Sequence, residues 1–288
     1  MSAGRPKLPS DTSDTDDDGV LDIDELVSGT GAAPLLPYTS RGLSLNGAVG
    51  TFLELPNRPE YALDGSWSLD AWIKPAATMA NAVIIRRDID NDLDGTFETV
   101  NFELGLTKVG AKWKPYVKQV SSATATTAAF TAETSADLAT IAADVWTHVG
   151  AVYDDVAKTM SLYVNNVLIK RTGFAGLENT VINQVGLVRC VAGEGIVGRL
   201  DALRVWNLAK ADFADYRSAV SDAVEGVART GLVASFLFDD KGASVQNFAA
   251  AANDWLGYWE HAAALAGAAV IVDDPQSPVL YDDLLDSD

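Results

Sequence analysis

The chain has 288 residues, 48% of them hydrophobic, which is long enough to bury the core of one large domain with flanking pieces. Its 21 Lys and Arg stand against 40 Asp and Glu, and the formal charge of −19 disfavours nucleic acid and anionic membrane surfaces and favours cations as partners. A single cysteine, Cys190, excludes an internal disulfide, and the uncharged run 262–272 is too short to cross a bilayer. We therefore expect no nucleic-acid partner and no membrane insertion.

Acidic residues near the N-terminus have the spacing of a calcium loop. Residues 14–25 read DTDDDGVLDIDE, and Gly19 falls where such a loop turns sharply. The alternative is a solvated acidic linker, but five acids, a glycine and an apolar residue in register favour Ca²⁺. The expected ligands, at loop positions 1, 3, 5, 7, 9 and 12, are Asp14, Asp16, Asp18, the carbonyl of Val20, Asp22 and Glu25.

This loop lacks the helices of an EF-hand. Two prolines lie upstream of it, and Gly29 and Gly31 end any downstream helix within about a turn. Residues 11–30 instead resemble the aspartate-rich calcium repeats of thrombospondin type 3. The resemblance implies that residues 1–34 are an acidic calcium-binding spacer in an extracellular, bacterial surface protein.

Residues 35–272 have the pattern of an all-β sandwich, with short alternating runs separated by Gly, Asn, Asp and Pro. In SWSLDAWI, alternate residues from Trp67 to Ile73 share one face, and only Trp72 breaks the alternation. TMSLYV, Asn165-Asn166 and VLIK predict a hairpin, because Asn tolerates left-handed backbone. Residues 211–224 have helical spacing and predict one short helix.

A second acidic cluster lies in RRDIDNDLDGTFE, between two strand-like runs. We interpret it as a loop at the rim of the sandwich. It has two readings: a calcium site, or a solvated hairpin tip whose charge Arg86 and Arg87 partly offset. The candidate ligands are Asp88, Asp90, Asp92, Asp94 and Glu98.

Four stretches resemble the laminin-G-like or concanavalin-A-like jelly rolls: LSLNGAVGTFLELP (43–56), SWSLDAWIKP (66–75), 146–169 and 198–216. The resemblance implies a two-sheet antiparallel jelly roll. Family members often begin with a strand like GLVASFLFDDKGASVQNFA, which here lies at 231–249. This stretch either closes the sandwich or starts a neighbouring module, and we expect residues 231–272 to close the sandwich in permuted order. Residues 273–288 are expected to be an acidic tail or the start of a further calcium repeat.

Asp201 alternates in register with Leu203 and Val205, so its carboxylate is expected to face the interior. A buried carboxylate needs partners. The family resemblance makes a structural calcium one reading, and a hydrogen-bonded structural aspartate is the other.

Aromatic residues and histidines add no catalytic motif. We interpret Trp67, Trp72, Trp146 and Trp206 as packing residues. His148 and His261 lie far apart in sequence, and no nucleophile motif or strand-borne pair of carboxylates accompanies them. Five further aromatic residues are less constrained by the strand pattern. We interpret them mainly as core residues and alternatively as rings that stack on a sugar: Trp113, Tyr116, Trp255, Tyr258 and Trp259.

The sequence therefore predicts a non-catalytic, calcium-binding module for adhesion or ligand binding, secreted or on a cell surface and part of a larger multi-module protein. The expected cofactor is Ca²⁺, and the partner is an extracellular protein or a glycan. The alternatives are a carbohydrate-binding appendage that targets an enzyme and a structural repeat of a surface fibre.

Overall fold

In the computed structural model the chain divides into two units, residues 1–39 and 40–288. The predicted calcium loop 14–25 and residues 279–288 lie outside the described residues. All described residues belong to the second unit: 41–63, 65–90, 92–97, 99–121, 130–175, 187–216, 230–238, 244–245, 247, 249 and 262–278.

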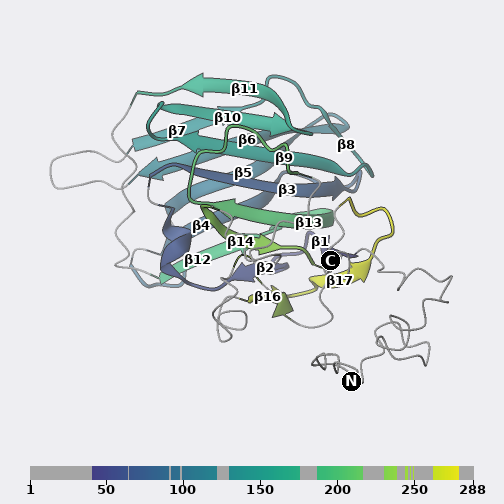
Figure 1. Cartoon of the computed structure of the whole chain (residues 1–288). Coiled ribbons are helices and arrows are strands. Elements are labelled where there is room, and N and C mark those ends of the chain that lie inside the picture. The colour runs from purple at the N-terminus through teal and green to yellow at the C-terminus, as the bar shows by residue number, and fades with distance from the viewer. Residues whose placement is uncertain are drawn as a thin grey trace, which may run out of the picture. The chain divides into compact units, whose positions relative to one another are not determined.

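Two antiparallel sheets form the sandwich (Figure 1). The order of the first sheet is β11 (Val167–Gly173), β10 (Thr159–Val164), β9 (Thr147–Asp154), β3 (Trp67–Pro75), β13 (Val197–Trp206), β1 (Arg41–Asn46) and β17 (Val270–Asp273), with β14 (Leu232–Phe236) beside β13. Strand β13 pairs with β3 along one edge, and along its other edge its first half pairs with β1 and its second half with β14.

The second sheet lies behind the first in Figure 1. Its order is β15 (Ser244–Val245), β16 (Ala263–Ala266), β2 (Phe52–Leu55), β12 (Leu187–Ala192), β4 (Ala82–Asp90), β5 (Thr99–Val109), β6 (Lys112–Ser121) and β7 (Phe130–Ser135), with β8 (Ile141–Ala142) beside β6. Among the described residues the one helical element is a 3₁₀ turn, η1 (Pro59–Ala62). The predicted all-β, two-sheet antiparallel sandwich is confirmed.

The core between the sheets follows the predicted alternation of β3. Trp67, Leu69 and Ile73 are fully buried in it, and the Trp67 ring stacks on Tyr153 with centroids 5.6 Å apart. Trp72 points to the other face of its sheet, where it is also buried. The break in alternation therefore marks a second buried layer outside the first sheet.

The predicted hairpin joins β10 and β11. Asn165 and Asn166 have φ angles of 50° and 60°, the left-handed conformation that a two-residue turn requires. The hairpin prediction is confirmed.

C-terminal strands lie in both sheets. In the first sheet β14 pairs with β13 and β17 pairs with β1, and in the second β16 pairs with β2. Of the helix predicted at 211–224, the structure describes only residues 211–216, which are irregular with a turn at 214–216 and are not helical.

A bulge in β13 corrects the expected orientation of Asp201. Register is lost between Asp201 and Arg204, where Ala202 has a φ of 45°. One extra residue reverses the faces, so Leu203 remains in the core while Asp201 lies opposite Trp72 on the outer face of the sheet. Asp201 is fully buried, but not in the interior between the sheets.

The outer face of the first sheet carries a buried carboxylate, that of Asp70. Its Oδ2 accepts hydrogen bonds from Arg204, through Nε at 2.7 Å and through Nη2, and from His148 Nε2 at 3.0 Å. Its Oδ1 accepts a hydrogen bond from Trp206 Nε1 at 3.0 Å. Burial raises the pKa of Asp70, but the Arg204 charge and the His148 hydrogen bond outweigh burial and lower the pKa to about 2.

Residues 207–216 cover this carboxylate. Ser68 Oγ donates to the Leu208 carbonyl at 2.8 Å, and Trp72 Nε1 donates to the Tyr216 carbonyl at 2.8 Å. Phe213 packs directly on Gly150, where any side chain would come within 2.5 Å of its ring. The glycine thus lets the covering segment lie flat on the sheet and exclude water from Asp70.

We predict that Asp70→Asn destabilises the fold by about 3–5 kcal/mol, because it leaves the buried Arg204 charge with only the more distant carboxylate of Asp215, 3.9 Å away. Chemical denaturation measures the change in the free energy of unfolding. Asp212→Asn, on the exposed part of the covering segment, is the control and should change it by less than about 1 kcal/mol. Equal effects of the two variants would contradict a structural role for the buried pair.

Low pH should remove the stability that the ionised Asp70 carboxylate contributes to the fold. A carboxylate with a depressed folded-state pKa stabilises the fold above its unfolded pKa of about 3.9, and this stability is lost as pH falls towards about 2. The stability gap between wild type and Asp70→Asn should therefore shrink by about 2 kcal/mol between pH 5 and pH 2. A gap that is constant with pH would show that Asp70 is not ionised in the folded protein.

Candidate metal centre

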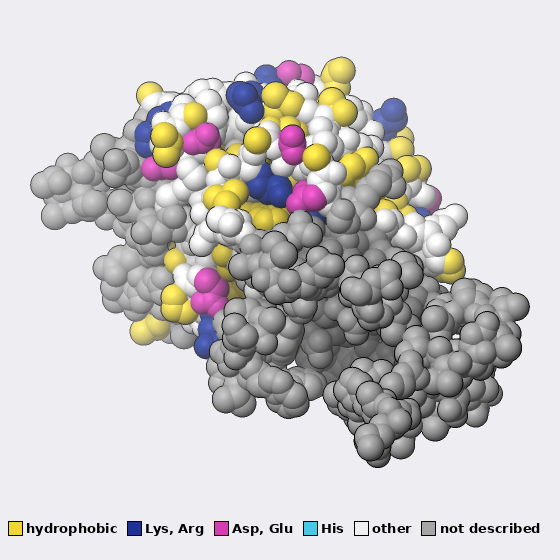
Figure 2. All heavy atoms as spheres, viewed as in Figure 1, with side chains coloured by type: hydrophobic (Ala, Val, Ile, Leu, Met, Phe, Trp, Pro, Cys, Tyr) yellow, Lys and Arg dark blue, Asp and Glu magenta, His cyan; other side chains and the backbone are white. Residues whose placement is uncertain are grey.

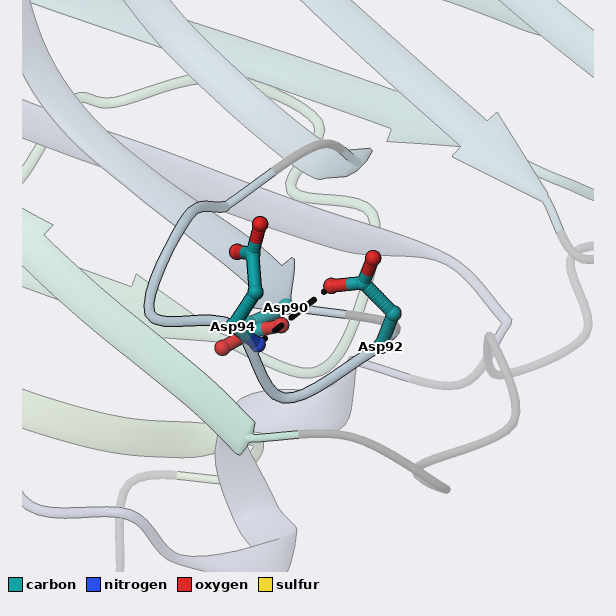
Figure 3. Close-up of side chains that lie close together, drawn as sticks. All are labelled: Asp90, Asp92 and Asp94. Carbon is teal, nitrogen blue, oxygen red and sulfur yellow. Dashed lines mark hydrogen bonds between the residues drawn. The ribbon is translucent and has the colours of Figure 1, made fainter.

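Three aspartates meet on the turn that follows β4 (Figure 3). Asp90 is the last residue of β4, so the strand fixes its backbone, and its side chain is fully buried. Asp92 and Asp94 lie on the exposed turn. One carboxylate oxygen from each lies within 4.8 Å of the others. The alternate spacing of the three aspartates thus brings their carboxylates together.

Hydrogen bonds within the turn hold this arrangement. Asp90 accepts hydrogen bonds from the backbone N–H groups of Leu93 at 2.7 Å and Gly95 at 3.0 Å. Asp92 Oδ1 accepts one from the N–H of Asp94 at 3.3 Å, and Asp94 Oδ1 accepts one from the N–H of Thr96 at 2.7 Å. The backbone is therefore folded around the carboxylates.

No positive side chain in the described part of the chain pairs with these three aspartates. Like charges so close together repel, and Asp90 has lost the water that would screen it. Backbone donors satisfy part of its hydrogen-bonding capacity but carry no full charge. The three carboxylates have the oxygen chemistry that a hard divalent cation such as Ca²⁺ takes.

Asp88 is placed elsewhere. Its Oδ1 lies 2.7 Å from Arg86 Nε, and its Oδ2 accepts a hydrogen bond from Arg189 Nη2 at 2.9 Å. β4 continues to Asp90, so Asp88 remains on the strand and faces its neighbours in the sheet. The structure brings Asp90, Asp92 and Asp94 together but does not add Asp88 to them, and Glu98 lies outside the described residues.

Arg189 links the aspartate turn to the sheet. Its guanidinium lies 4.3 Å from the centroid of the Phe97 ring, at the end of the turn, and 5.6 Å from that of Phe52. The same guanidinium pairs with Asp88. Sequence reasoning missed this anchor, because β12 is remote in sequence from the turn and a single Arg in a strand carries no signal.

Asp201 has hydrogen-bond donors around its carboxylate. Its Oδ1 accepts from the N–H of Ala202 at 2.7 Å, and its Oδ2 accepts from the Ser277 hydroxyl. The sequence left two readings of Asp201 open, a calcium ligand and a hydrogen-bonded structural aspartate. These contacts favour the structural aspartate.

The described aromatic candidates are bound into the fold. Trp113 is fully buried in the core, and its Nε1 donates to the Ala80 carbonyl at 2.9 Å. The Tyr116 hydroxyl donates a hydrogen bond to Glu103. Burial, and to a lesser extent this hydrogen bond, raises the pKa of Tyr116. Trp255, Tyr258 and Trp259 lie outside the described residues.

His148 is fully buried between Asp70 and the rings of Trp72 and Tyr216. Ser68, the nearby strand hydroxyl, is hydrogen-bonded to the covering segment instead. The Asp70–His148 pair is thus closed off from solvent. The second histidine, His261, lies outside the described residues.

Surface charge is mixed on the described face in Figure 2, where acidic and basic side chains are interspersed rather than gathered by sign. No described helix is both long and apolar enough to span a bilayer.

Residues 46–212 match the model of the family Laminin_G_3, described as the concanavalin A-like lectin/glucanases superfamily. The match covers more than half of the chain, so the protein belongs to this family. A search of curated proteins found no match.

Several solved structures are similar in fold. A Bacteroides ovatus protein proposed to bind carbohydrate has 14% identity and a TM-score of 0.48, over 83% of this chain and 59% of that protein. The heptameric SAP-like pentraxin of Limulus polyphemus has 16% identity and a TM-score of 0.40, over 61% and 80%.

The CBM40 module of the Ruminococcus gnavus IT-sialidase, bound to α2,3-sialyllactose, has 15% identity and a TM-score of 0.45, over 59% of this chain and 91% of that one. At these identities and scores the similarities carry no information on the ligand of this chain.

Proposed function

We propose that the protein is a non-catalytic, calcium-binding module of an extracellular protein, with a role in adhesion or ligand binding. The observation that carries the proposal is the convergence of Asp90, Asp92 and Asp94 within 4.8 Å, with Asp90 fully buried and no described cationic side chain paired with any of the three. A bound Ca²⁺ would offset two of their three negative charges and join the turn to β4.

The N-terminal loop extends the same chemistry. Asp14, Asp16, Asp18, Val20, Asp22 and Glu25 supply a second set of calcium oxygens, in a spacer that precedes the sandwich in the chain. Two calcium sites in one secreted or surface-bound chain fit extracellular conditions, where calcium is abundant. Calcium would stiffen the spacer and the rim turn, and the sandwich would present the binding face.

Calcium bound at the aspartate turn, the turn of Asp90, Asp92 and Asp94, should stabilise the sandwich. At a calcium concentration about 100 times the dissociation constant, binding adds about 2.7 kcal/mol to the free energy of unfolding and raises the melting temperature by about 5–10 °C. The variant Asp92→Asn/Asp94→Asn should lose this gain and one bound calcium, measured by calorimetry and elemental analysis.

The control Asp137→Asn/Asp212→Asn changes the net charge equally, at two exposed positions outside the aspartate turn, and should keep both the gain and the calcium. Asp16→Asn/Asp18→Asn should remove the other calcium and leave the melting shift of the sandwich. An unchanged melting curve and no bound calcium in the wild-type protein would refute the proposal.

A second candidate function is carbohydrate binding, as an appendage that targets an enzyme elsewhere in the parent protein. It is supported by membership of a family described by its lectins and glucanases. The histidine that the structure describes, His148, is fully buried with Asp70, which favours sugar binding over sugar hydrolysis as the role of this chain.

A glycan array tests this candidate. We expect reproducible binding of one class of sugar that survives at physiological salt, since a sugar is held by hydrogen bonds and ring contacts rather than by net charge. Absence of binding across the array, with the protein folded and loaded with calcium, would leave adhesion to a protein as the function.

A further inference from the structure

A pocket of about 420 Å³ lies on the first sheet, between the end of β3, the start of β13, and strands β1 and β17. Its volume falls in the range of small-molecule binding sites. Polar side chains from five separate segments converge on it: Ser44, Lys74, Asp144, Arg199, Asp273 and Asp274.

Charges around this pocket are balanced. Lys74 Nζ and Arg199 Nε lie 3.6 and 3.7 Å from the same oxygen of Asp274, which is largely buried. Asp273 pairs with Arg41 at 3.0 Å. Lys74 and Arg199 line the pocket together with the carboxylates of Asp144, Asp273 and Asp274. Arg41 lies outside the lining, but its pairing with Asp273 brings the charges to three of each sign, so an ionic ligand meets little net charge.

The lining still offers many donors and acceptors. Lys74 Nζ donates one hydrogen bond to Gln276 Oε1 at 3.1 Å, but the separations of 3.6 and 3.7 Å from Lys74 and Arg199 to Asp274 are longer than ordinary hydrogen bonds. Both cationic groups therefore retain N–H donors for a ligand. Carboxylates of Asp144 and Asp273 accept hydrogen bonds, and Ser44 does both. A ligand rich in hydroxyl groups matches this mixture, because each hydroxyl both donates and accepts.

The pocket and the aspartate turn lie on different sheets. Strands β1, β3, β13 and β17 of the first sheet contribute to the pocket, whereas the turn follows β4 of the second sheet. Ala76, which lines the pocket, donates its N–H to the carbonyl of Val197, the first residue of β13. Val83, near the start of β4, donates its N–H to the carbonyl of Glu194, which lies between β12 and β13. Asp90 ends β4 eight residues after Ala82, about 26 Å away along an extended strand. A ligand in the pocket would therefore not touch the calcium turn.

We propose that this pocket binds a neutral sugar unit, without a requirement for calcium at the Asp90 turn. The inference rests on the carbohydrate-binding function given above as the second candidate. It places the sugar against Lys74, Arg199 and Ser44 on the first sheet.

The test titrates the labelled full chain with the methyl glycosides of glucose, galactose, mannose and N-acetylglucosamine, and follows backbone amide NMR shifts. We expect one of them to shift the amides of Ser44, Gly198 and Arg199, with the same affinity in the Asp92→Asn/Asp94→Asn variant. A matched titration with glycine, a zwitterion, should cause no shift at these amides.

Two variants separate the site from the fold. Ala76→Phe fills the pocket that Ala76 lines, and should weaken binding at least tenfold. Ala77→Phe, one residue further on and exposed, should not weaken it. Ser44→Ala removes one hydroxyl without a change of charge and should weaken binding severalfold. Melting curves show whether each variant is folded.

The outcomes distinguish a failure of the pocket as the sugar site from a failure of carbohydrate binding as the function. If a sugar binds but shifts other amides, or binds equally to Ala76→Phe, the pocket is not the site and carbohydrate binding stands. Shifts at the pocket with glycine rather than a sugar would overturn the ligand class. If none of the glycosides binds and the glycan array is also blank, both inferences fail, while calcium binding is judged by its own experiment.

Discussion

A carboxylate removed from water must meet a cation or enough hydrogen-bond donors, and this protein depends on that condition at several places. Asp70 meets Arg204, His148 and Trp206 beneath the segment 207–216. Asp201 meets a backbone N–H and Ser277. In the rim turn, Asp90 meets backbone N–H groups and two further carboxylates, and here the described chain supplies no cation.

The same condition explains why one face of the first sheet is covered. An open antiparallel sheet would leave Asp70 and Arg204 in water, where their interaction is weak. Phe213 on Gly150 and Tyr216 on Trp72 close the face and make the pair part of a buried layer. Stability of the sandwich is thus linked to an aspartate that hydrophobic alternation alone would place at the surface.

Much of the fold could be predicted from local patterns. The alternation in β3 and the Asn165-Asn166 turn gave the strand faces and the hairpin, because a period of two and left-handed Asn backbone are local properties. Asp201 was placed on the wrong face because the bulge at Ala202 has no local signature. Residues 211–216 have helical spacing but are irregular over the sheet, where contacts with β3 and β9 prevail.

The candidate site was predictable only in part. Spacing identified Asp90, Asp92 and Asp94, since alternate residues of a tight turn converge on one side. It could not exclude Asp88, whose partners Arg86 and Arg189 depend on strand pairing. The charge-balanced pocket could not be foreseen, because its lining comes from five segments that only the register of β1, β3, β13 and β17 brings together.

Calcium at the rim turn is the central claim, and an anomalous difference map from crystals grown in calcium tests it most directly. The map should show one peak bounded by the carboxylates of Asp90, Asp92 and Asp94, at oxygen distances of about 2.3–2.6 Å. At saturating calcium, a turn with no peak, or one whose carboxylates pair instead with a Lys or Arg side chain, would contradict the claim.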